Sequence, residues 1–477
     1  MLDAIVVGAG PNGLAAAITL ARAGRSVHVI EAFDAIGGGV RSAELTLPGF
    51  VHDVCSAIYP MGIGSPFFRG LPLAAHGLEW AHPELPLAHP LDGGRAAALH
   101  RSLDATAEEL GPDGPTYARI FGDLTERWRA LIAPPPRRLA DVVGPSPGLW
   151  RTAAAGLSPA ARVARRRFVT EEARALWAGL AAHGMQPLVR AGTGGFALSL
   201  GAAAHAVGWP FVRGGAQRLA DALAGVLRGH GGTIETGHQV RSIEELPAAR
   251  VVLLDVAPEA LARIAGDLLP SRFSDQLARF RRGPAAFKLD YALSQPIPWQ
   301  AEACRRAGVV HVGGTCSEVG LAFGEVARGL HPARPFVLVA QPSLFDRGRV
   351  PPGSSQHTAW AYCQVPEGSG RDMTDLLEAQ IERFAPGFRD VVLARHTPDP
   401  RALEAHNANL VGGDIWGGAC DLRHLIFRPT PRLRPWTTPH PRIFLCSAST
   451  PPGPGVHGLC GFMAARAALR ALRRRKI

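Results

Sequence analysis

Three glycines near the start of the chain have the spacing of a phosphate-binding turn. Gly8, Gly10 and Gly13 form a GxGxxG pattern. In such a pattern the first glycine makes a tight turn, the second lets the backbone approach a pyrophosphate, and the third lets a helix pack against a strand. Glu31 lies 18 residues after Gly13, where an acidic side chain accepts hydrogen bonds from a ribose hydroxyl and disfavours a 2′-phosphate. These residue types predict a dinucleotide site.

The residues around this motif predict the elements that would position it. Residues 4–7 are a continuous apolar run, typical of a strand buried on both faces of a parallel sheet. An alanine-rich helix is expected over residues 13–23, ended by Gly24, and a second strand over residues 26–30 delivers the acid. The residues expected to contact the nucleotide here are Gly8, Gly10, Pro11, Asn12, Gly13, Glu31 and Ala32.

A second glycine-rich turn stands near the other end of the chain. Residues 453–458 precede a helix rich in alanine and leucine. The unpaired N–H groups and the dipole at a helix start attract anions. Two such helix starts at opposite ends of one chain suggest that both touch one cofactor. We expect Gly455, Val456, His457 and Gly458 to contact it.

The stretch after the second strand carries a family resemblance. Residues 35–53 read AIGGGVRSAELTLPGFVHD, and the order of acid, Gly-Gly, basic residue and Ser resembles FAD-binding flavoproteins of the amine oxidase and phytoene desaturase superfamily. In that superfamily this second glycine motif lies against the FAD pyrophosphate. The resemblance implies that FAD contacts come from Gly38, Gly39, Val40, Arg41 and Ser42, with Gly39 in place of the arginine of the usual Gly-Gly-Arg.

Two later stretches extend the resemblance over almost the whole chain. Residues 211–243 are similar to the segment that holds the adenine, which implies backbone contacts from Val240. Residues 444–469 resemble the terminal motif in which a strand ends under the isoalloxazine ring and a helix begins at its pyrimidine edge, where the helix dipole stabilises reduced flavin. The match is closest to the bacterial and mitochondrial branch of phytoene desaturase-like oxidoreductases, and it implies FAD bound without covalent attachment.

The expected architecture is an α/β fold of two lobes. A Rossmann-type FAD-binding lobe is assembled from discontinuous segments, at residues 1–95, 206–284 and 431–477. A substrate lobe takes residues 96–205, which are helical by pattern, and residues 285–430, whose alternation predicts a mixed sheet.

The composition excludes several other classes of protein. The 477 residues are 47% apolar and 19% charged, enough for several lobes with buried cores. The net charge of +11 does not indicate a nucleic-acid partner, because the basic residues are arginine apart from Lys288 and Lys476, as a GC-rich gene would encode. The seven cysteines never form a CxxC pair, so neither a metal site nor a redox disulfide is expected. No second nucleotide motif follows, so a nicotinamide cofactor is not expected.

The expected location is the cytoplasm, with a peripheral membrane contact left open. A strand directly after Met1 leaves no room for a signal peptide, and glycines interrupt the first uncharged run. Two basic stretches, residues 161–168 and 470–476, would suit an anionic membrane surface that supplies an apolar substrate. The alternative is a solvated helix face and a basic tail. No particular oligomeric state is indicated.

Flavin chemistry asks little of side chains, because placing the substrate over N5 is most of the task. His457 is the first candidate catalytic residue, as a proton acceptor or a hydrogen-bond partner of the flavin, with a structural histidine as the alternative. Asp414 is a second candidate, and with Trp416 it could line the substrate pocket from a GGDIWGG loop, where an aspartate also stabilises turns. Lys288 could correspond to the lysine near N5 in amine oxidases, but its alternating strand favours a structural role.

The resemblance and the residues together predict an FAD-dependent oxidoreductase. Its expected reaction is desaturation of a C–C bond in an apolar small molecule of isoprenoid or polyene type, by hydride transfer to flavin N5, with oxygen or a quinone as electron acceptor. Amine oxidation is an alternative that predicts an aromatic cage, for which four tyrosines offer little material. A redox-neutral flavin isomerase and a non-catalytic FAD-binding scaffold are further alternatives.

Overall fold

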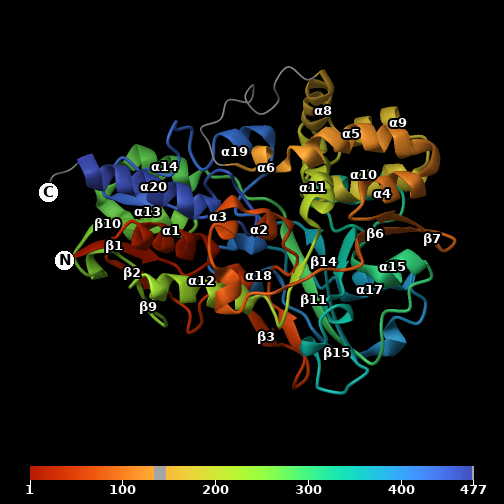
Figure 1. The fold of residues 1–477 in the computed structure, drawn as a ribbon, viewed down its shortest axis with the longest axis horizontal. Coiled ribbons are helices and arrows are strands. Elements are labelled where there is room, and N and C mark those ends of the chain that lie inside the picture. Colours follow the sequence, from red (N-terminus) through yellow and green to blue (C-terminus); the bar gives the residue numbers. More distant parts are fainter. Residues whose placement is uncertain (134–146, 475–477) are drawn as a thin grey trace.

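Two β-sheets form the centres of two adjoining lobes. The computed structural model describes residues 1–133 and 147–474, and Figure 1 shows a parallel sheet in one half of the molecule and a larger mixed sheet in the other. We call the two halves the parallel-sheet lobe and the mixed-sheet lobe.

The parallel-sheet lobe is built on five strands from the start, middle and end of the chain. The strand order is β16 (Ile443–Leu445), β10 (Ala249–Leu254), β1 (Leu2–Val7), β2 (Val27–Ile30) and β9 (Thr233–Glu235). Every pairing in this sheet is parallel. The short apolar strands suit a sheet that is buried on both faces.

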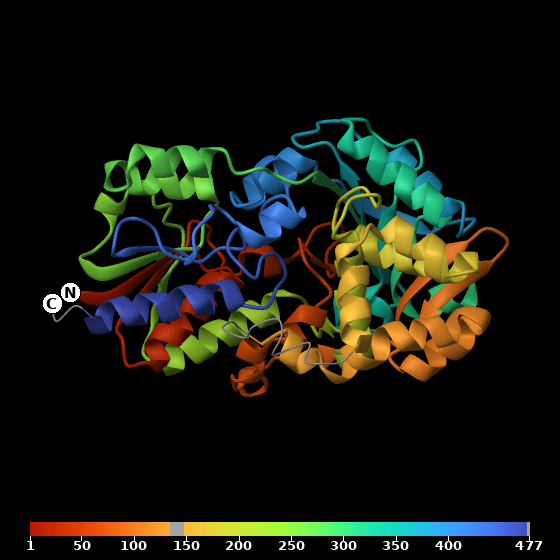
Figure 2. The same cartoon turned by 90° about the horizontal axis from the view of Figure 1, so that it is seen from above.

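Helices cover both faces of the parallel sheet. One face carries α1 (Pro11–Arg22), α12 (Gln217–Gly229) and α20 (Leu459–Arg474), and the other carries α13 (Pro258–Ala265) and α14 (Ser271–Ala278). The central strand β1 serves both layers, because Ala4 and Val6 pack with the first set and Ile5 and Val7 with the second. Figure 2 shows the two helical layers on opposite sides of the strands.

The mixed-sheet lobe is built on seven strands. Their order is β15 (Val392–His396), β11 (Ala285–Leu293), β14 (His357–Val365), β13 (Val337–Ala340), β12 (Ala307–Val312), β6 (Leu85–Leu91) and β7 (Arg95–Leu99). The pairing of β12 with β6 is parallel and the other pairings are antiparallel.

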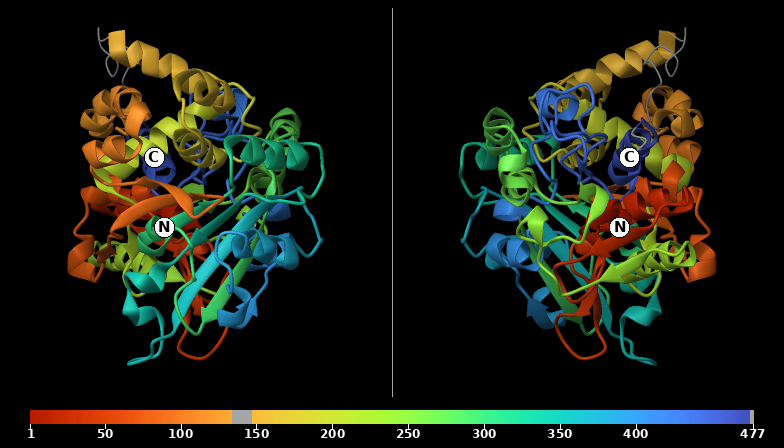
Figure 3. Two further views of the ribbon diagram at one scale, coloured as in Figure 1. Left: turned by 90° about the vertical axis from the view of Figure 1, so that its right-hand side faces the viewer. Right: turned by 90° about the vertical axis from the view of Figure 1, so that its left-hand side faces the viewer.

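A layer of helices covers one face of the mixed sheet. It contains α4 (Leu103–Glu109), α5 (Gly114–Glu126), α6 (Trp128–Leu131), α8 (Pro147–Leu157), α9 (Ala160–Arg167), α10 (Glu171–Ala182), α11 (Thr193–Val207) and α16 (Cys316–Ala327). The shorter α15 (Glu302–Arg306) and α17 (Thr374–Glu382) pack on the opposite face. Figure 3 shows α8 projecting at the edge of the helical layer.

Short elements join the two lobes. They are the hairpin of β3 (Ser42–Glu44) and β4 (Val51–Asp53), the pair of β5 (Trp80–Ala81) and β8 (Phe211–Val212), and the helices α2 (Pro60–Gly64), α3 (Pro66–Arg69), α18 (Pro400–His406) and α19 (Leu422–Ile426). Single 3₁₀ turns lie at residues 38–40, 73–76, 111–113, 243–245, 266–268, 342–344, 347–349, 389–391 and 411–413.

The expected α/β architecture, with one parallel and one mixed sheet, is confirmed. The strands and helix expected over residues 4–7, 13–23 and 26–30 lie within or close to β1, α1 and β2. The chain enters the mixed sheet at Leu85, ahead of the boundary expected at residue 95, because the fully buried β6 pairs with β12. The boundaries expected at residues 205, 284 and 430 lie in α11, directly before β11, and between α19 and β16.

A fully buried arginine ties the two lobes together. The Arg349 guanidinium lies 2.8 Å from Asp53 of β4 and 2.9 Å from Asp346, and it donates to the Val212 carbonyl at 2.8 Å. All three charged side chains are almost inaccessible to solvent. Because the interior leaves no water to replace these contacts, loss of the arginine would leave two buried carboxylates uncompensated.

Candidate active site

The GxGxxG turn is sterically fixed by the end of β10. Gly8 has a φ of +100°. A Cβ on Gly13 would lie 1.9 Å from the Gly8 carbonyl oxygen, and a Cβ on Gly10 would lie 3.0 Å from the Asp255 carboxylate. Neither position therefore admits a side chain without a shift of its neighbours. The turn opens directly into α1, with Pro11 in the first helical turn.

The Glu31 carboxylate lies at the mouth of this turn. It accepts hydrogen bonds from the Ala9 N–H at 2.6 Å and from the Phe33 N–H at 3.0 Å. The exposed Ala32 lies between Glu31 and Phe33 in sequence. Asn12 is 8% exposed, and its Oδ1 has no hydrogen-bond partner among the described residues. Both polar side chains lie at the first helix start, where a dinucleotide would pass.

The second glycine motif meets the first. A Cβ on Gly38, whose φ is +52°, would lie 3.2 Å from the Gly10 Cα. The neighbouring Val40 is fully buried and anchors the turn in the core of the parallel-sheet lobe. Gly39 differs, because no atom lies within 4 Å of its Cβ position. The place where the superfamily has an arginine is therefore open space in this chain.

Arg41 supplies a buried cation beside the two glycine turns. Its guanidinium donates to the Gly38 carbonyl at 3.1 Å and to the His406 carbonyl at 2.6 Å, and it lies 4.0 Å from the centroid of the Phe33 ring. Its Nη1 is buried with no partner among the described residues. Burial lowers the pKa of Arg41, while Glu31 and Cys55 act in the opposite direction. A donor left unsatisfied in this position fits a pyrophosphate oxygen.

Ser42 and Val240 differ in their hydrogen bonding. The Ser42 hydroxyl donates to Asp53 at 3.0 Å and accepts from the Gln217 N–H at 3.1 Å, so it holds the start of α12. Val240 is 7% exposed, and its backbone forms no hydrogen bond with another described residue. Free backbone groups at this point suit the adenine contact that the resemblance implies.

The glycine-rich turn near the end of the chain packs against the one near its start. A Cβ on Gly461 in α20 would lie 1.8 Å from the Asn12 carbonyl, and one on Gly458 would lie 2.8 Å from the Phe68 ring. Gly455 has a φ of +119°, and the Val456 carbonyl would lie 3.1 Å from a Cβ on Gly62. The two helix starts expected to share one cofactor therefore lie side by side.

His457 caps the start of α20. Its Nδ1 accepts a hydrogen bond from the Leu459 N–H at 3.0 Å, and its carbonyl accepts one from the Ser65 hydroxyl at 2.6 Å. Burial lowers the pKa of His457 to about 4, and hydrogen bonds with the Gly453 and Pro454 backbone partly oppose this shift. The imidazole is therefore neutral near pH 7, with its Nδ1 lone pair already in use.

Asp414 holds its own loop together. Its carboxylate accepts hydrogen bonds from the Gly283, Trp416 and Gly418 N–H groups at 3.0, 2.8 and 2.7 Å. The side chain is fully buried. Trp416 is half-buried and packs edge-on against Phe196, with ring centroids 5.7 Å apart. The loop thus presents an aromatic side chain, while its aspartate is occupied by backbone groups.

The helix-covered face of the mixed sheet carries a buried charge cluster that sequence reasoning missed. Lys288 forms an ion pair with Asp290, two residues along β11 on the same face. Asp290 also lies 3.8 Å from His52 and 3.5 Å from His396. Burial would raise the pKa of the Asp290 carboxyl, but Lys288 and the two histidines hold it below its usual value. The spacing of Lys288 and Asp290 in an alternating strand was the available sequence signal.

Lys288 lies close to the residues of the second glycine motif. Burial raises the pKa of the Cys55 thiol, while Lys288 and Arg41 act in the opposite direction, which places the thiol between the two cations. Next to Lys288, Trp360 and Tyr362 form a stacked pair on β14, with ring centroids 5.7 Å apart, and the Lys288 Nζ lies 5.6 Å from the Trp360 ring centroid. Through Lys288, this part of the mixed sheet lies close to Cys55, which follows the second glycine motif in sequence.

A group of neutral histidines lies farther along the same sheet face. His183 and His311 are joined by an Nε2 to Nε2 hydrogen bond of 2.9 Å, and the His89 Nε2 donates to the Gly314 carbonyl at 2.7 Å. Burial lowers the pKa of His89 and His183 to about 4 and that of His311 further. Among the described residues, no group of three or more His, Cys, Asp or Glu side chains is arranged to hold a metal ion.

The fold and these contacts define an FAD-dependent oxidoreductase. The cradle of glycines, the orphaned Arg41 donor and the paired helix starts fit the pyrophosphate of the cofactor. Residues 12–261 match the family model described as flavin containing amine oxidoreductase, and the chain belongs to that family. The family resemblance and the FAD assignment made from the sequence are confirmed.

Individual relatives place the chain within this family. It is 27% identical over 558 residues to mouse pyridine nucleotide-disulfide oxidoreductase domain-containing protein 2, covering 99% of this chain and 94% of the mouse protein. It is 29% identical over 129 residues to a limonene dehydrogenase polypeptide of Castellaniella defragrans, covering 27% of this chain and 23% of that protein. The fold is similar to that of putrescine oxidase bound to putrescine, with a TM-score of 0.62 at 17% identity over 99% of this chain and 98% of the oxidase.

Proposed function

We propose that this flavoenzyme desaturates a C–C bond of an apolar substrate of isoprenoid or polyene type. Bound FAD supplies the two-electron acceptor, which takes a hydride at N5. The substrate would lose that hydride together with a proton, which passes to water, and oxygen or a quinone would accept the electrons in the second half of the cycle. The protein contributes the placement of the substrate and the electrostatics around it.

The observation that carries this proposal is the character of the sheet face next to the glycine turns. Its side chains pack in one apolar cluster with Ile58 and Met61 from the segments that join the two lobes, and the cluster includes Trp360 and Tyr362. Lys288 lies beside this cluster and forms an ion pair with Asp290, so neither charge is left to balance that of a cationic amine. An uncharged hydrocarbon needs no such balance. The likeness to limonene dehydrogenase supports an isoprenoid substrate.

The contacts of the candidate residues support positioning roles. His457 fits a residue that fixes the start of α20, so that the helix dipole faces the reduced cofactor. Asp414 fits a residue that shapes its loop and presents Trp416 to the substrate. Lys288 is the group whose charge lies closest to the proposed reaction region, with Asp290 holding it in place.

Amine oxidation is the second candidate. It is favoured by the stacked Trp360 and Tyr362 pair, which could flank an amine, and by the likeness of the fold to putrescine oxidase. An aromatic pair attracts a cation, but the neighbouring ammonium of Lys288 opposes it.

One spectroscopic experiment separates these functions. The visible spectrum of the anaerobic protein is recorded before and after addition of phytoene in liposomes, and separately after addition of putrescine or cyclohexylamine. Desaturation predicts that the flavin bands bleach with the polyene alone. Bleaching with the amines alone would overturn the proposal in favour of amine oxidation. A spectrum unchanged by every donor would move the assignment to an isomerase or a scaffold.

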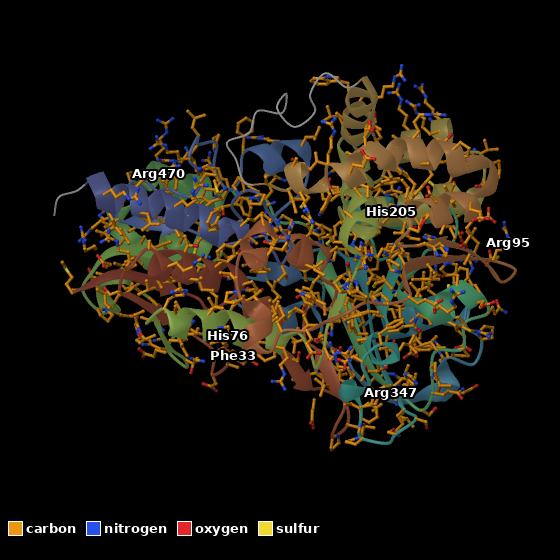
Figure 4. The ribbon with its side chains drawn as sticks, in the orientation of Figure 1. Phe33, His76, Arg95, His205, Arg347 and Arg470 are labelled. Carbon is orange, nitrogen blue, oxygen red and sulfur yellow. The ribbon has the colours of Figure 1, made fainter. Side chains whose placement is uncertain are left out.

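A peripheral membrane contact is part of the same proposal, because an apolar substrate resides in a bilayer. A groove of about 920 Å³ beside α20 is lined by Arg432, Leu433, Arg434 and Arg470. Figure 4 shows Arg470 at the outer end of the parallel-sheet lobe. Leu433 is fully exposed between its two arginines, a combination that suits insertion into an anionic surface. No helix among the described residues is long and apolar enough to cross a bilayer.

Vesicle sedimentation tests this contact. The protein is expected to sediment with phosphatidylglycerol vesicles and to remain in solution with phosphatidylcholine vesicles. The double variant Arg432→Glu/Arg434→Glu should lose binding. The matched double variant Arg165→Glu/Arg166→Glu, on the exposed face of α9, should keep it. Loss of binding in the α9 variant alone would move the contact to α9, and absence of sedimentation with either vesicle would refute it.

A further inference from the structure

Asp255 is a buried acid at the centre of the cofactor cradle. It directly follows β10, and its N–H donates to the Val7 carbonyl at 2.7 Å. Its own carbonyl accepts a hydrogen bond from the Asn409 side chain at 2.9 Å. The residue is 7% exposed. The position of Asp255 is therefore fixed by contacts from segments far apart in the chain.

The Asp255 side chain bonds one glycine of the phosphate-binding turn and fills the space where the other two would carry a side chain. Its Oδ2 accepts a hydrogen bond from the Gly13 N–H at 2.8 Å and lies 3.0 Å from the Cβ position of Gly10. Its Cβ lies 3.1 Å from the Cβ position of Gly8. The second oxygen, Oδ1, forms no hydrogen bond with a described residue. One oxygen thus holds the turn, and the other is available to a ligand.

The surroundings of Asp255 contain no cation among the described residues that balances a negative charge. The titratable groups that interact electrostatically with Asp255 are Glu31 after β2, Cys446 after β16 and Cys460 in α20. Burial raises the pKa of the Asp255 carboxyl to about 7, and Glu31 adds to the shift, while the Gly13 N–H opposes it. Burial also raises the pKa of both thiols, so they stay neutral over the physiological range. Asp255 therefore lies beside the turn that must receive the doubly charged pyrophosphate of FAD, with the Glu31 carboxyl group as a second acid nearby.

We propose that Asp255 is a cofactor-binding residue that holds FAD as a neutral carboxylic acid, with Oδ1–H donating to the pyrophosphate while Oδ2 accepts from Gly13. Above the pKa of the free carboxyl, FAD binding then takes up one proton from solvent, and no covalent bond to the cofactor forms. When Asp255 loses that proton, the donor disappears and an anion stands against the phosphates. The residue makes retention of the cofactor depend on pH.

The direction of this dependence follows from linkage. The protonated form dominates below a pH of about 7, so FAD is held most tightly there and is released as the pH rises. Binding restricted to the protonated form makes the Kd about thirtyfold higher at pH 8.5 than at pH 6. The pKa of Asp255 in the FAD-free protein sets the pH at which the Kd begins to rise, and the higher pKa in the complex, where the pyrophosphate favours the neutral acid, sets the pH at which the rise ends.

Release of FAD from the holoprotein tests the proposal without any measurement of turnover. The protein is diluted into buffers from pH 6 to pH 8.5, and free FAD is followed by its fluorescence. The wild type should show a Kd that rises by about thirtyfold. Asp255→Asn, which keeps the shape and removes the charge, should give a flat profile close to the wild-type value at pH 6. Asp275→Asn removes an exposed carboxylate from α14 of the same lobe and should follow the wild type.

Two results would overturn the proposal. One is a wild-type Kd that does not change between pH 6 and pH 8.5. The other is a pH dependence that persists unchanged in Asp255→Asn. Circular dichroism at each pH confirms that the variant is folded, and Asp255→Ser, which is also neutral and can donate a hydrogen bond, carries the same prediction if the asparagine variant does not accumulate.

Discussion

The two lobes differ in the titratable groups that lie near their functional surfaces. The parallel-sheet lobe buries an acid, Asp255, beside its phosphate-binding turn, and the mixed-sheet lobe holds the neutral imidazoles of the buried His89 and His311 and the half-buried His183 under its helices. Burial disfavours the charged form in both places, which raises the pKa of the acid and lowers the pKa of the imidazoles. The comparison teaches that alkaline pH acts on the cofactor side through Asp255, whereas acidic pH acts on the substrate side through this group of imidazoles and on the cofactor side through His457.

The largest effect is expected from a side chain at Gly13, where the cofactor side of the molecule has the least room. Gly13→Ala places a Cβ 1.9 Å from the Gly8 carbonyl oxygen, so the turn must open and FAD should be lost on gel filtration. Gly39→Ala is the matched control, because nothing lies within 4 Å of its Cβ position, and it should keep its FAD. Full FAD occupancy in Gly13→Ala would show that backbone approach does not set the cofactor site.

The next largest effect is expected on stability, at the buried Arg349 that connects the two sides. Arg349→Met leaves Asp53 and Asp346 buried without their cation, and it should lower the free energy of unfolding by about 3–5 kcal/mol. Chemical denaturation measures this change. Arg347, labelled in Figure 4, lies on the same 3₁₀ turn and donates hydrogen bonds at the surface to the Ser354 and Gln356 carbonyls. Arg347→Met should therefore cost under about 1 kcal/mol. Equal losses of unfolding free energy in the two variants would show that the buried Arg349 does not stabilise the fold more than a surface arginine.

A smaller effect is expected at Lys288 on the substrate side, where two variants separate the role of its charge in flavin reduction from its role in stability. Lys288→Met should slow anaerobic flavin reduction about ten- to a hundredfold, and it should also destabilise the fold, because Asp290 loses its partner. Lys288→Met/Asp290→Leu removes both charges and should regain much of the stability while flavin reduction stays slow. Recovery of the rate in the double variant would mean that the lysine acts on the fold alone.

The smallest effect is a slope of stability with pH. His89 and His183 have a folded-state pKa of about 4, below the value of about 6.5 for an unfolded histidine. The unfolded chain therefore binds more protons between those values, so stability is fully present above about pH 6.5 and is lost as the pH falls towards 4. Urea denaturation at pH 7 and pH 5 should show the loss, and His183→Gln should reduce the slope. An unaltered slope in that variant would place the acid sensitivity elsewhere.

The cofactor side could be predicted from the sequence to a large extent. Gly8, Gly10, Gly13 and Glu31 stand close together in the chain, and the turn they form depends on local backbone geometry. The sequence also predicted that two helix starts meet at one cofactor. In the structure these helices lie in contact at Gly461 and Asn12. Asp255 was missed because its importance comes from its position after β10, 242 residues from the Gly13 N–H that it accepts.

The substrate side could be predicted only as an architecture. The alternation in residues 285–293 predicted a strand, but the pairing that places Lys288 beside Tyr362 joins residues far apart in the chain. The sequence offered a catalytic and a structural role for both Asp414 and His457, and in the structure the Asp414 carboxylate and the His457 Nδ1 accept hydrogen bonds from backbone N–H groups. Whether a polar atom is free depends on the packing of neighbouring loops, which spacing alone does not reveal.

The contact between α1 and α20 has a consequence for how the protein is made. The glycine turn at residues 8–13 leaves the ribosome well before Gly461, which packs against its helix. The mixed-sheet lobe can assemble before α20 is made, whereas the layer of the parallel-sheet lobe that contains α20 cannot close until that helix has followed. Acquisition of FAD therefore waits for α20, and a ribosome that stalls before α20 releases a protein unable to retain its cofactor.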